Sequence, residues 1–288
     1  MEGWEIMISL IVENENNEKL DLMNPSYFDS VTVDGLTPGK ASINTTVIAN
    51  SDGSLINNAR NEDRPITIDI EPAFPIEENR LRIYQFFKRK KYITLYVKTT
   101  NRDLKIEGMV ESVEGSLFVE KQSITIEILC NDPYFKDQLE TYTNMARVLD
   151  LFEFPFSIEE EGKEFSRIEK TIEQTVINAG DTETGVIIEI SASGTVINPT
   201  IYNTVTRESF GLNITMQSGD VITINTNNFQ KKVELLRNGE TTNIINSIIK
   251  GNKWFKLLQG DNLFTYTCDT GEEFLNIRFI YNNLYEGV

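Results

Sequence analysis

The chain has 288 residues, an apolar fraction of 40% and a formal net charge of −17. This length allows two domains with separate cores, and this apolar fraction predicts a folded rather than a disordered chain. Such an acidic protein suits neither a nucleic-acid groove nor an anionic membrane surface, because both require concentrated positive charge. The first residues are acidic and the apolar runs are short, so we expect neither a signal peptide nor a membrane span.

The sequence contains no histidine and two cysteines, Cys130 and Cys268. Without histidine there is no Ser–His or Cys–His nucleophile, and the usual zinc and haem ligands are missing. Two cysteines this far apart give neither a disulfide framework nor the spacing of a metal site. We therefore predict buried free thiols, no metal and no cofactor. Carboxylate-only chemistry remains open at this point, and we expect no enzymatic activity.

The first half alternates like a half-buried sheet. Ile66, Ile68 and Ile70 occupy every second position, which predicts one strand. Ile124, Ile126, Ile128 and Cys130 do the same, which predicts a second strand. Asp132-Pro133 ends that strand, because proline cannot donate a ladder hydrogen bond. We interpret it as the last strand of a first domain, residues 1–136. Residues 50–64 are polar and weakly patterned, which predicts a long loop or arm.

One helix is predicted, over Pro75–Lys91. Proline and two glutamates at its start suit a helix N-terminus, and the basic run at its end suits the negative pole of the helix dipole. A second interpretation is that basic side chains in so acidic a chain meet the acidic surface of a neighbouring subunit. The candidate subunit interface comprises Arg80, Arg82, Lys88, Arg89, Lys90 and Lys91.

The second half consists of short strand-like runs separated by turn residues, which predicts an all-β sandwich over residues 176–288. Its clearest hairpin signal is Asn238-Gly239, a pair that supplies both positive-φ positions of a type I′ turn. Residues 137–175 read as a connector. The predicted fold class is thus mainly β, with an α+β first domain and an all-β second domain.

Two features of the second half invite a binding or catalytic interpretation. Trp254 beside two lysines would serve as a sugar-stacking platform, but we favour a core aromatic, because large aromatic side chains are mostly buried. Two carboxylate pairs occur in turn-like segments that offer no apolar pocket to raise the pKa of one member, as glycosidase chemistry requires. The pairs are Asp181 with Glu183 and Glu272 with Glu273.

A resemblance emerges from several motifs in order. The run Cys130–Phe135 resembles the end of the N-terminal domain of phage distal tail proteins, which cap the tail tube of long-tailed phages. Further similar motifs follow along the chain: Asn178–Asp181, Asn198–Asn203, Gly219–Thr226, Asn238-Gly239 and Leu257–Asn262. Each motif alone is weakly specific, and their order makes the resemblance specific.

The resemblance implies an N-terminal β-sandwich with one helix and a hairpin arm that forms a hexameric ring, and a galectin-like C-terminal sandwich. It implies a structural virion protein at the tail tip, assembled in the host bacterial cytoplasm. Its partners would be the tail tube, tape-measure, tail-associated and receptor-binding proteins, without sequence-specific nucleic acid or membrane. The alternative is a carbohydrate-binding adhesin of the host wall. Galectins bind sugar through a pocket that contains histidine, which this chain lacks.

Overall fold

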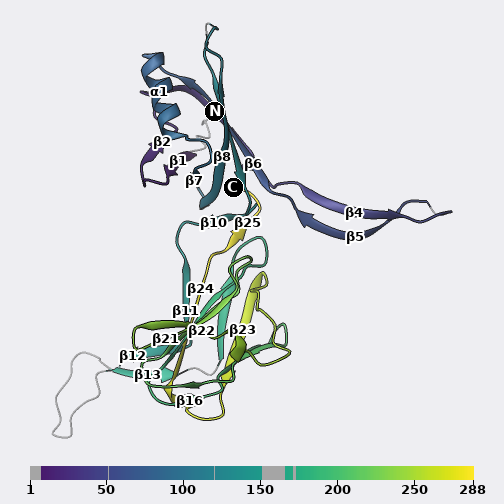
Figure 1. The fold of residues 1–288 in the computed structure, drawn as a ribbon, viewed down its shortest axis with the longest axis vertical. Helices are drawn as coiled ribbons and strands as arrows, with labels where there is room; N and C mark the ends of the chain where they lie inside the picture. The colour runs from purple at the N-terminus through teal and green to yellow at the C-terminus, as the bar shows by residue number, and fades with distance from the viewer. Residues whose placement is uncertain (1–7, 51, 120, 151–165, 171–172) are drawn as a thin grey trace, which may run out of the picture. The chain divides into compact units, whose positions relative to one another are not determined.

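The computed structural model describes residues 8–50, 52–119, 121–150, 166–170 and 173–288. It divides into two compact units, of which the first comprises Met1–Gln138 together with Leu284–Val288, and the second Leu139–Asn283. The second unit is thus inserted into the first along the chain. Both units are built of β-strands, and the described residues include one α-helix, in the first unit (Figure 1). The predicted mainly-β fold class is confirmed.

The first unit is organised around a sheet in the order β2-β1-β7-β8-β9-β6-β3, with β10 pairing both β8 and β25. The strands are β1 (Ser9–Asn14), β2 (Lys19–Asp21), β3 (Phe28–Asp34), β6 (Arg64–Pro72), β7 (Tyr92–Lys98), β8 (Asp103–Gly115), β9 (Ile124–Cys130), β10 (Phe135–Asp137) and β25 (Leu284–Tyr285).

The alternation predicted for β6 and β9 is present, and it makes the core. Ile66, Ile68 and Ile70 are buried and lie opposite the buried isoleucines of β9 in antiparallel register. The long strand β8 pairs with β7 through its first half and with β9 through its second, with a bulge between Val110 and Ser112. A bulge bends a strand locally, so both halves of the sheet can cover one core.

The polar segment before β6 is a two-stranded ribbon rather than a loop. β4 (Ala41–Val47) and β5 (Ser54–Asn61) pair only with each other, and Figure 1 shows them leaving the main sheet of the first unit. Almost every residue of the two strands is exposed. Since neither face is buried, the sequence lacks the alternation of a half-buried strand, which is why β5 was not predicted.

Helix α1 (Ile76–Phe86) is shorter than the predicted Pro75–Lys91. The Phe87 N–H donates to the Ile83 carbonyl, and the Phe87 ring is buried in the core. The chain then turns: Lys90 has a φ of 64°, and its N–H donates to the Val110 carbonyl of β8. Residues 88–91 therefore lie beyond the helix, and its last turn contains no basic residue. The dipole interpretation of this basic run is wrong for that reason.

The end of the chain returns to the first unit. β25 pairs with β10, and the Val288 N–H donates to the Leu36 carbonyl. The buried Arg64 donates to four carbonyl oxygens from separate segments. These acceptors are Gly35 (2.7 Å), Thr37 (2.6 Å), Pro133 (2.6 Å) and Glu286 (2.5 Å). This tail lies outside the predicted first domain, residues 1–136.

The second unit is a β-sandwich of two main sheets, in the orders β11-β24-β15-β20-β21-β22 and β14-β23-β17-β18, with the short pairs β12-β13 and β16-β19. Its strands are β11 (Thr141–Asn144), β12 (Ala146–Asp150), β13 (Ser166–Lys170), β14 (Glu173–Asn178), β15 (Ile187–Ala192), β16 (Val196–Ile197), β17 (Thr200–Asn203), β18 (Glu208–Gly211), β19 (Thr215–Met216), β20 (Val221–Asn225), β21 (Lys232–Arg237), β22 (Glu240–Asn243), β23 (Gly260–Thr267) and β24 (Leu275–Tyr281). Short 3₁₀ turns cover Ile245–Ser247 and Glu272–Phe274.

Parts of the predicted connector, residues 137–175, belong to this sandwich. β11 pairs with β24, and the adjoining Met145 is buried in the sandwich core. β14 pairs with β23 from Glu173 onward. Both strands are short, and each pairs with a strand far along the chain, a pairing that local patterning does not reveal. Residues 151–165 and 171–172 of the predicted connector lie outside the described residues.

The hairpin predicted at Asn238-Gly239 is confirmed. Arg237 pairs with Glu240, leaving a two-residue loop between β21 and β22. Asn238 and Gly239 have φ values of 52° and 83°, the positive values that a type I′ turn needs.

Candidate subunit-contact surface

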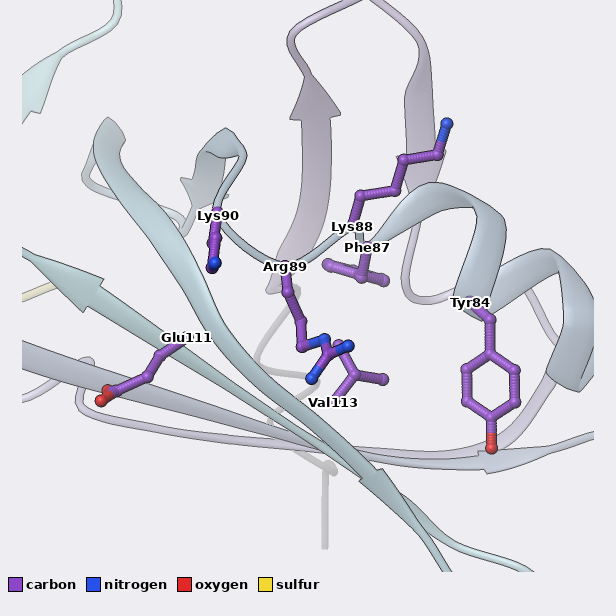
Figure 2. Close-up of a pocket in the computed structure, with 7 residues that line it drawn as sticks. All are labelled: Tyr84, Phe87, Lys88, Arg89, Lys90, Glu111 and Val113. Atoms are coloured by element: carbon purple, nitrogen blue, oxygen red, sulfur yellow. The ribbon is translucent and has the colours of Figure 1, made fainter.

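The turn after α1 forms an open hollow of about 830 Å³ with strand β8. Its lining combines the apolar and aromatic side chains of Tyr84, Phe87 and Val113 with the charged side chains of Lys88, Arg89, Lys90 and Glu111. In Figure 2, Arg89 extends toward Val113, whereas Lys88 points the opposite way. Tyr84 and Glu111 lie on opposite sides of the hollow. We call this feature the basic hollow.

The backbone around the basic hollow is fixed by hydrogen bonds to β8. Besides the bond from the Lys90 N–H, the Val110 N–H donates to the Lys91 carbonyl. The buried ring of Phe87 anchors the turn in the core, and its centroid lies 5.0 Å from the ring centroid of Phe86. The three exposed cations are therefore held at the surface by an ordered turn.

The structure separates the six predicted interface residues into two groups. Arg80 bonds Gln122 at 2.9 Å and contacts Glu77 at 3.8 Å, while Arg82 stacks on the Tyr27 ring at 4.2 Å. Lys91 pairs with Glu15 at 2.8 Å, and this bond lowers the pKa of the Glu15 carboxyl below its usual value. These three basic residues are engaged within the chain.

Lys88, Arg89 and Lys90 form the second group. All three are exposed, and no ion pair joins them to another of the described residues. They are brought together by the turn after α1, whereas sequence reasoning placed them on a helix. Of the six residues of the predicted interface, these three are the ones whose positive charges are available to contact another subunit.

The β4–β5 ribbon is a further candidate contact surface, which sequence reasoning described only as an arm. Its aliphatic side chains Ile43, Val47, Leu55 and Ile56 are each more than half exposed, and Val47 is 77% exposed. Apolar side chains gathered on an exposed ribbon mark an interaction site more often than chance exposure does. Asn61 at its base donates to the Tyr134 hydroxyl at 2.7 Å.

The residues considered for binding or catalysis are not brought together as a site. Trp254 is half-buried, 5.3 Å from the Phe210 ring in an edge-on contact, with Lys231 Nζ 5.7 Å from its ring centroid. Glu183 forms an ion pair with Lys256, and Glu272 and Glu273 start a 3₁₀ turn. The described residues contain no cluster of three metal-ligating side chains. Trp254 is thus a packing residue of the second unit.

Both cysteines are free thiols. Cys130 ends strand β9 with its side chain buried in the first core, and burial raises the pKa of its thiol to about 12, although the nearby Arg64 acts in the opposite direction. Cys268 is half-buried at the edge of the second core. In the described part of the chain, no helix is long and apolar enough to cross a membrane.

Comparison with known proteins finds a family match that lies mainly in the second unit. Residues 179–285 match the family model described as siphovirus-type tail component, C-terminal domain. No curated protein sequence matches the chain. The predicted resemblance to phage distal tail proteins is confirmed by this match and by the solved structures that share the fold.

Two solved structures illustrate that shared fold. The Dit protein of phage SPP1, described as a hub of the adsorption apparatus in phages that infect Gram-positive bacteria, superposes with a TM-score of 0.64 at 14% identity, over 95% of this chain and 98% of that chain. A chain of the phage P2 baseplate in its activated, calcium-containing conformation superposes with a TM-score of 0.52 at 11% identity, over 98% of this chain and 100% of that chain.

Proposed function

Because residues 179–285 match the siphovirus-type tail component family and the whole chain shares the fold of a phage hub protein, we propose that this protein is a structural hub of a phage tail tip. It acts by geometry: copies of the first unit close into a hexameric ring between the tail tube and the baseplate. Closure requires a heterologous contact, in which one surface of a subunit meets a different surface of the next.

The observation that carries the proposal is the exposed β4–β5 ribbon. A two-stranded ribbon on its own is marginally stable in water, and this one leaves its aliphatic side chains uncovered in the single chain. A neighbouring subunit would bury them. The basic hollow supports the same assignment, because Lys88, Arg89 and Lys90 would meet the acidic surface of another copy.

The proposed partners are the tail tube, tape-measure and tail-associated proteins at the ring, and a receptor-binding protein at the second unit. The proposed location is the virion tail tip after assembly in the bacterial cytoplasm. The proposal includes no catalysis and no cofactor. No observation in the second unit favours the adhesin alternative, since the Trp254 ring packs against Phe210.

Light scattering and electron microscopy of the purified chain test this function. We expect particles of about six copies with a central opening. The double variant Ile43→Asp, Ile56→Asp should reduce them to single chains, because charge on the ribbon opposes its burial. A matched control is Phe229→Asp, which changes a fully exposed residue of the second unit. A single chain at every concentration, together with absence from isolated tail ends, would contradict the proposal.

A further inference from the structure

The hairpin between β8 and β9 ends in three consecutive apolar residues that the described part of the chain leaves half or fully exposed. Leu117 is 46% exposed, Phe118 100% and Val119 49%. Figure 1 shows this hairpin end standing clear of the rest of the first unit. We call Leu117–Val119 the apolar tip. Placing a phenylalanine wholly in water forgoes the free energy of burying one of the largest apolar side chains.

The apolar tip stands on an ordered base. The Ser116 N–H donates to the Ser123 carbonyl at 3.3 Å, and Gln122 Nε2 donates to the Leu117 carbonyl at 3.3 Å. Arg80 of α1 in turn donates to Gln122 Oε1 at 2.9 Å. The helix thus braces the base of the tip through two side chains. A braced apolar tip loses less conformational entropy on docking than a free loop would.

The lining of the basic hollow is chemically complementary to the apolar tip. Tyr84, Phe87 and Val113 supply an apolar and aromatic lining, and Lys88, Arg89 and Lys90 supply a positive rim. The tip is apolar and follows Glu114, in a chain whose formal charge is −17. No tip residue lines the hollow of its own chain, so both features are open at once.

We propose that the apolar tip of one copy seats in the basic hollow of the next. The two patches differ, so their contact is heterologous, the kind that a closed ring requires. This inference rests on the proposed ring and names one of its contacts. Phe118 provides the apolar anchor, and the lysine and arginine rim meets Glu114 on the strand that precedes the tip.

Cysteine cross-linking of the full chain tests the contact directly. In a Cys268→Ser background, which removes the half-buried native thiol, one chain carries Phe118→Cys and a second carries Val113→Cys. A short bis-maleimide should join the mixed chains into covalent dimers, while each variant alone should remain uncoupled. Chains carrying both substitutions should give a ladder that ends at the size of the ring.

The matched control replaces Phe118→Cys by Phe229→Cys, which is equally exposed but lies in the second unit. It should give no dimer with Val113→Cys. If light scattering shows the ring and Phe118→Cys still fails to couple, the tip contact is wrong and the ring stands. If the protein is a single chain and nothing couples, both proposals are wrong. Equal coupling by the control would also overturn the tip contact.

Discussion

Arg64 and Glu286 are 222 residues apart in the chain, yet Arg64 Nη2 donates a 2.5 Å hydrogen bond to the Glu286 carbonyl oxygen. All four of its hydrogen bonds go to backbone carbonyl oxygens, whose dipoles stabilise the positive charge, and burial lowers the pKa of the Arg64 guanidinium from its usual value. Its ring neighbour Phe135 lies 5.0 Å away. A single side chain therefore holds the start of β6, two loops and the chain terminus together.

Arg64→Ala should lower the free energy of unfolding of the first unit by about 3 kcal/mol, because buried carbonyls would lose a charged donor. Arg64→Lys should recover only part of this loss, since an ammonium group cannot reach all four acceptors in the plane of a guanidinium. Denaturant unfolding followed by tryptophan and tyrosine fluorescence measures the change. The control Arg60→Ala, on the exposed ribbon, should be neutral, and an equal loss there would contradict this account.

Neutralising the basic hollow should weaken self-association. The triple variant Lys88→Gln, Arg89→Gln, Lys90→Gln should raise the dissociation constant about tenfold, and added salt should reduce the difference because exposed charges are screened. Sedimentation velocity at two salt concentrations measures both effects. A control with the same loss of charge replaces Lys98, Lys232 and Lys253, which form surface ion pairs. Equal weakening by the control would assign the effect to net charge.

Gly271 and Gly239 form a matched pair for backbone strain in the second unit. Both have positive φ, 88° and 83°, but a Cβ at Gly271 would collide with the Thr195 carbonyl, whereas Gly239 has open space. Gly239→Ala should cost about 1 kcal/mol of unfolding free energy, the penalty of the left-handed conformation. Gly271→Ala should cost about 3 kcal/mol, because neighbouring backbone must also move. Thermal unfolding of both variants compares the two losses of stability. A larger loss for Gly239→Ala than for Gly271→Ala would contradict this account.

Asp220 should make the second unit sensitive to acid. It is buried and accepts hydrogen bonds from Arg237 Nε at 3.0 Å and from the Gln217 N–H at 2.7 Å. The Arg237 bonds hold the pKa of the Asp220 carboxyl below its usual value, although burial acts in the opposite direction. A lowered folded-state pKa stabilises the fold above the unfolded-state pKa of about 4, and this stabilisation disappears as pH falls through the folded-state value.

Asp220→Asn should therefore destabilise the second unit most near neutral pH, with the deficit shrinking as the pH falls below the unfolded-state pKa of about 4. Denaturant unfolding at a series of pH values measures it. Asp261→Asn, at an exposed position of β23, should change stability little at either pH. A deficit for Asp220→Asn that is independent of pH would show that packing, rather than ionisation, is responsible.

The predictions from sequence succeeded where the cause is local. Ile66, Ile68 and Ile70 show the burial that their alternation predicts, and Asn238-Gly239 makes its turn through its own backbone preferences. The helix was predicted with the right start but extended too far, because the basic run after Phe87 has good helix propensity. Tertiary contact decided the end: the buried Phe87 ring and the bonds to β8 redirect the chain.

The parts not predicted depend on partners far along the chain. β11 and β25 are short and lack alternation, and each acquires its ladder only once a distant strand is in place. The interface trio was predicted by charge alone, but its separation from Arg80, Arg82 and Lys91 depends on which of the six find partners within the chain. A sequence pattern does not show which of the six basic residues find a partner within the chain.

The pairing of β10 with β25 has an evolutionary consequence. Lys136 lies opposite Leu284, so the points where the chain leaves and re-enters the first unit sit on adjacent hydrogen-bonded strands. Recombination at these two junctions could exchange everything between residues 139 and 283 for an unrelated module while leaving the first unit intact. Under the proposed function, such an exchange would give a phage tail a new second unit while the ring-forming unit stays unchanged.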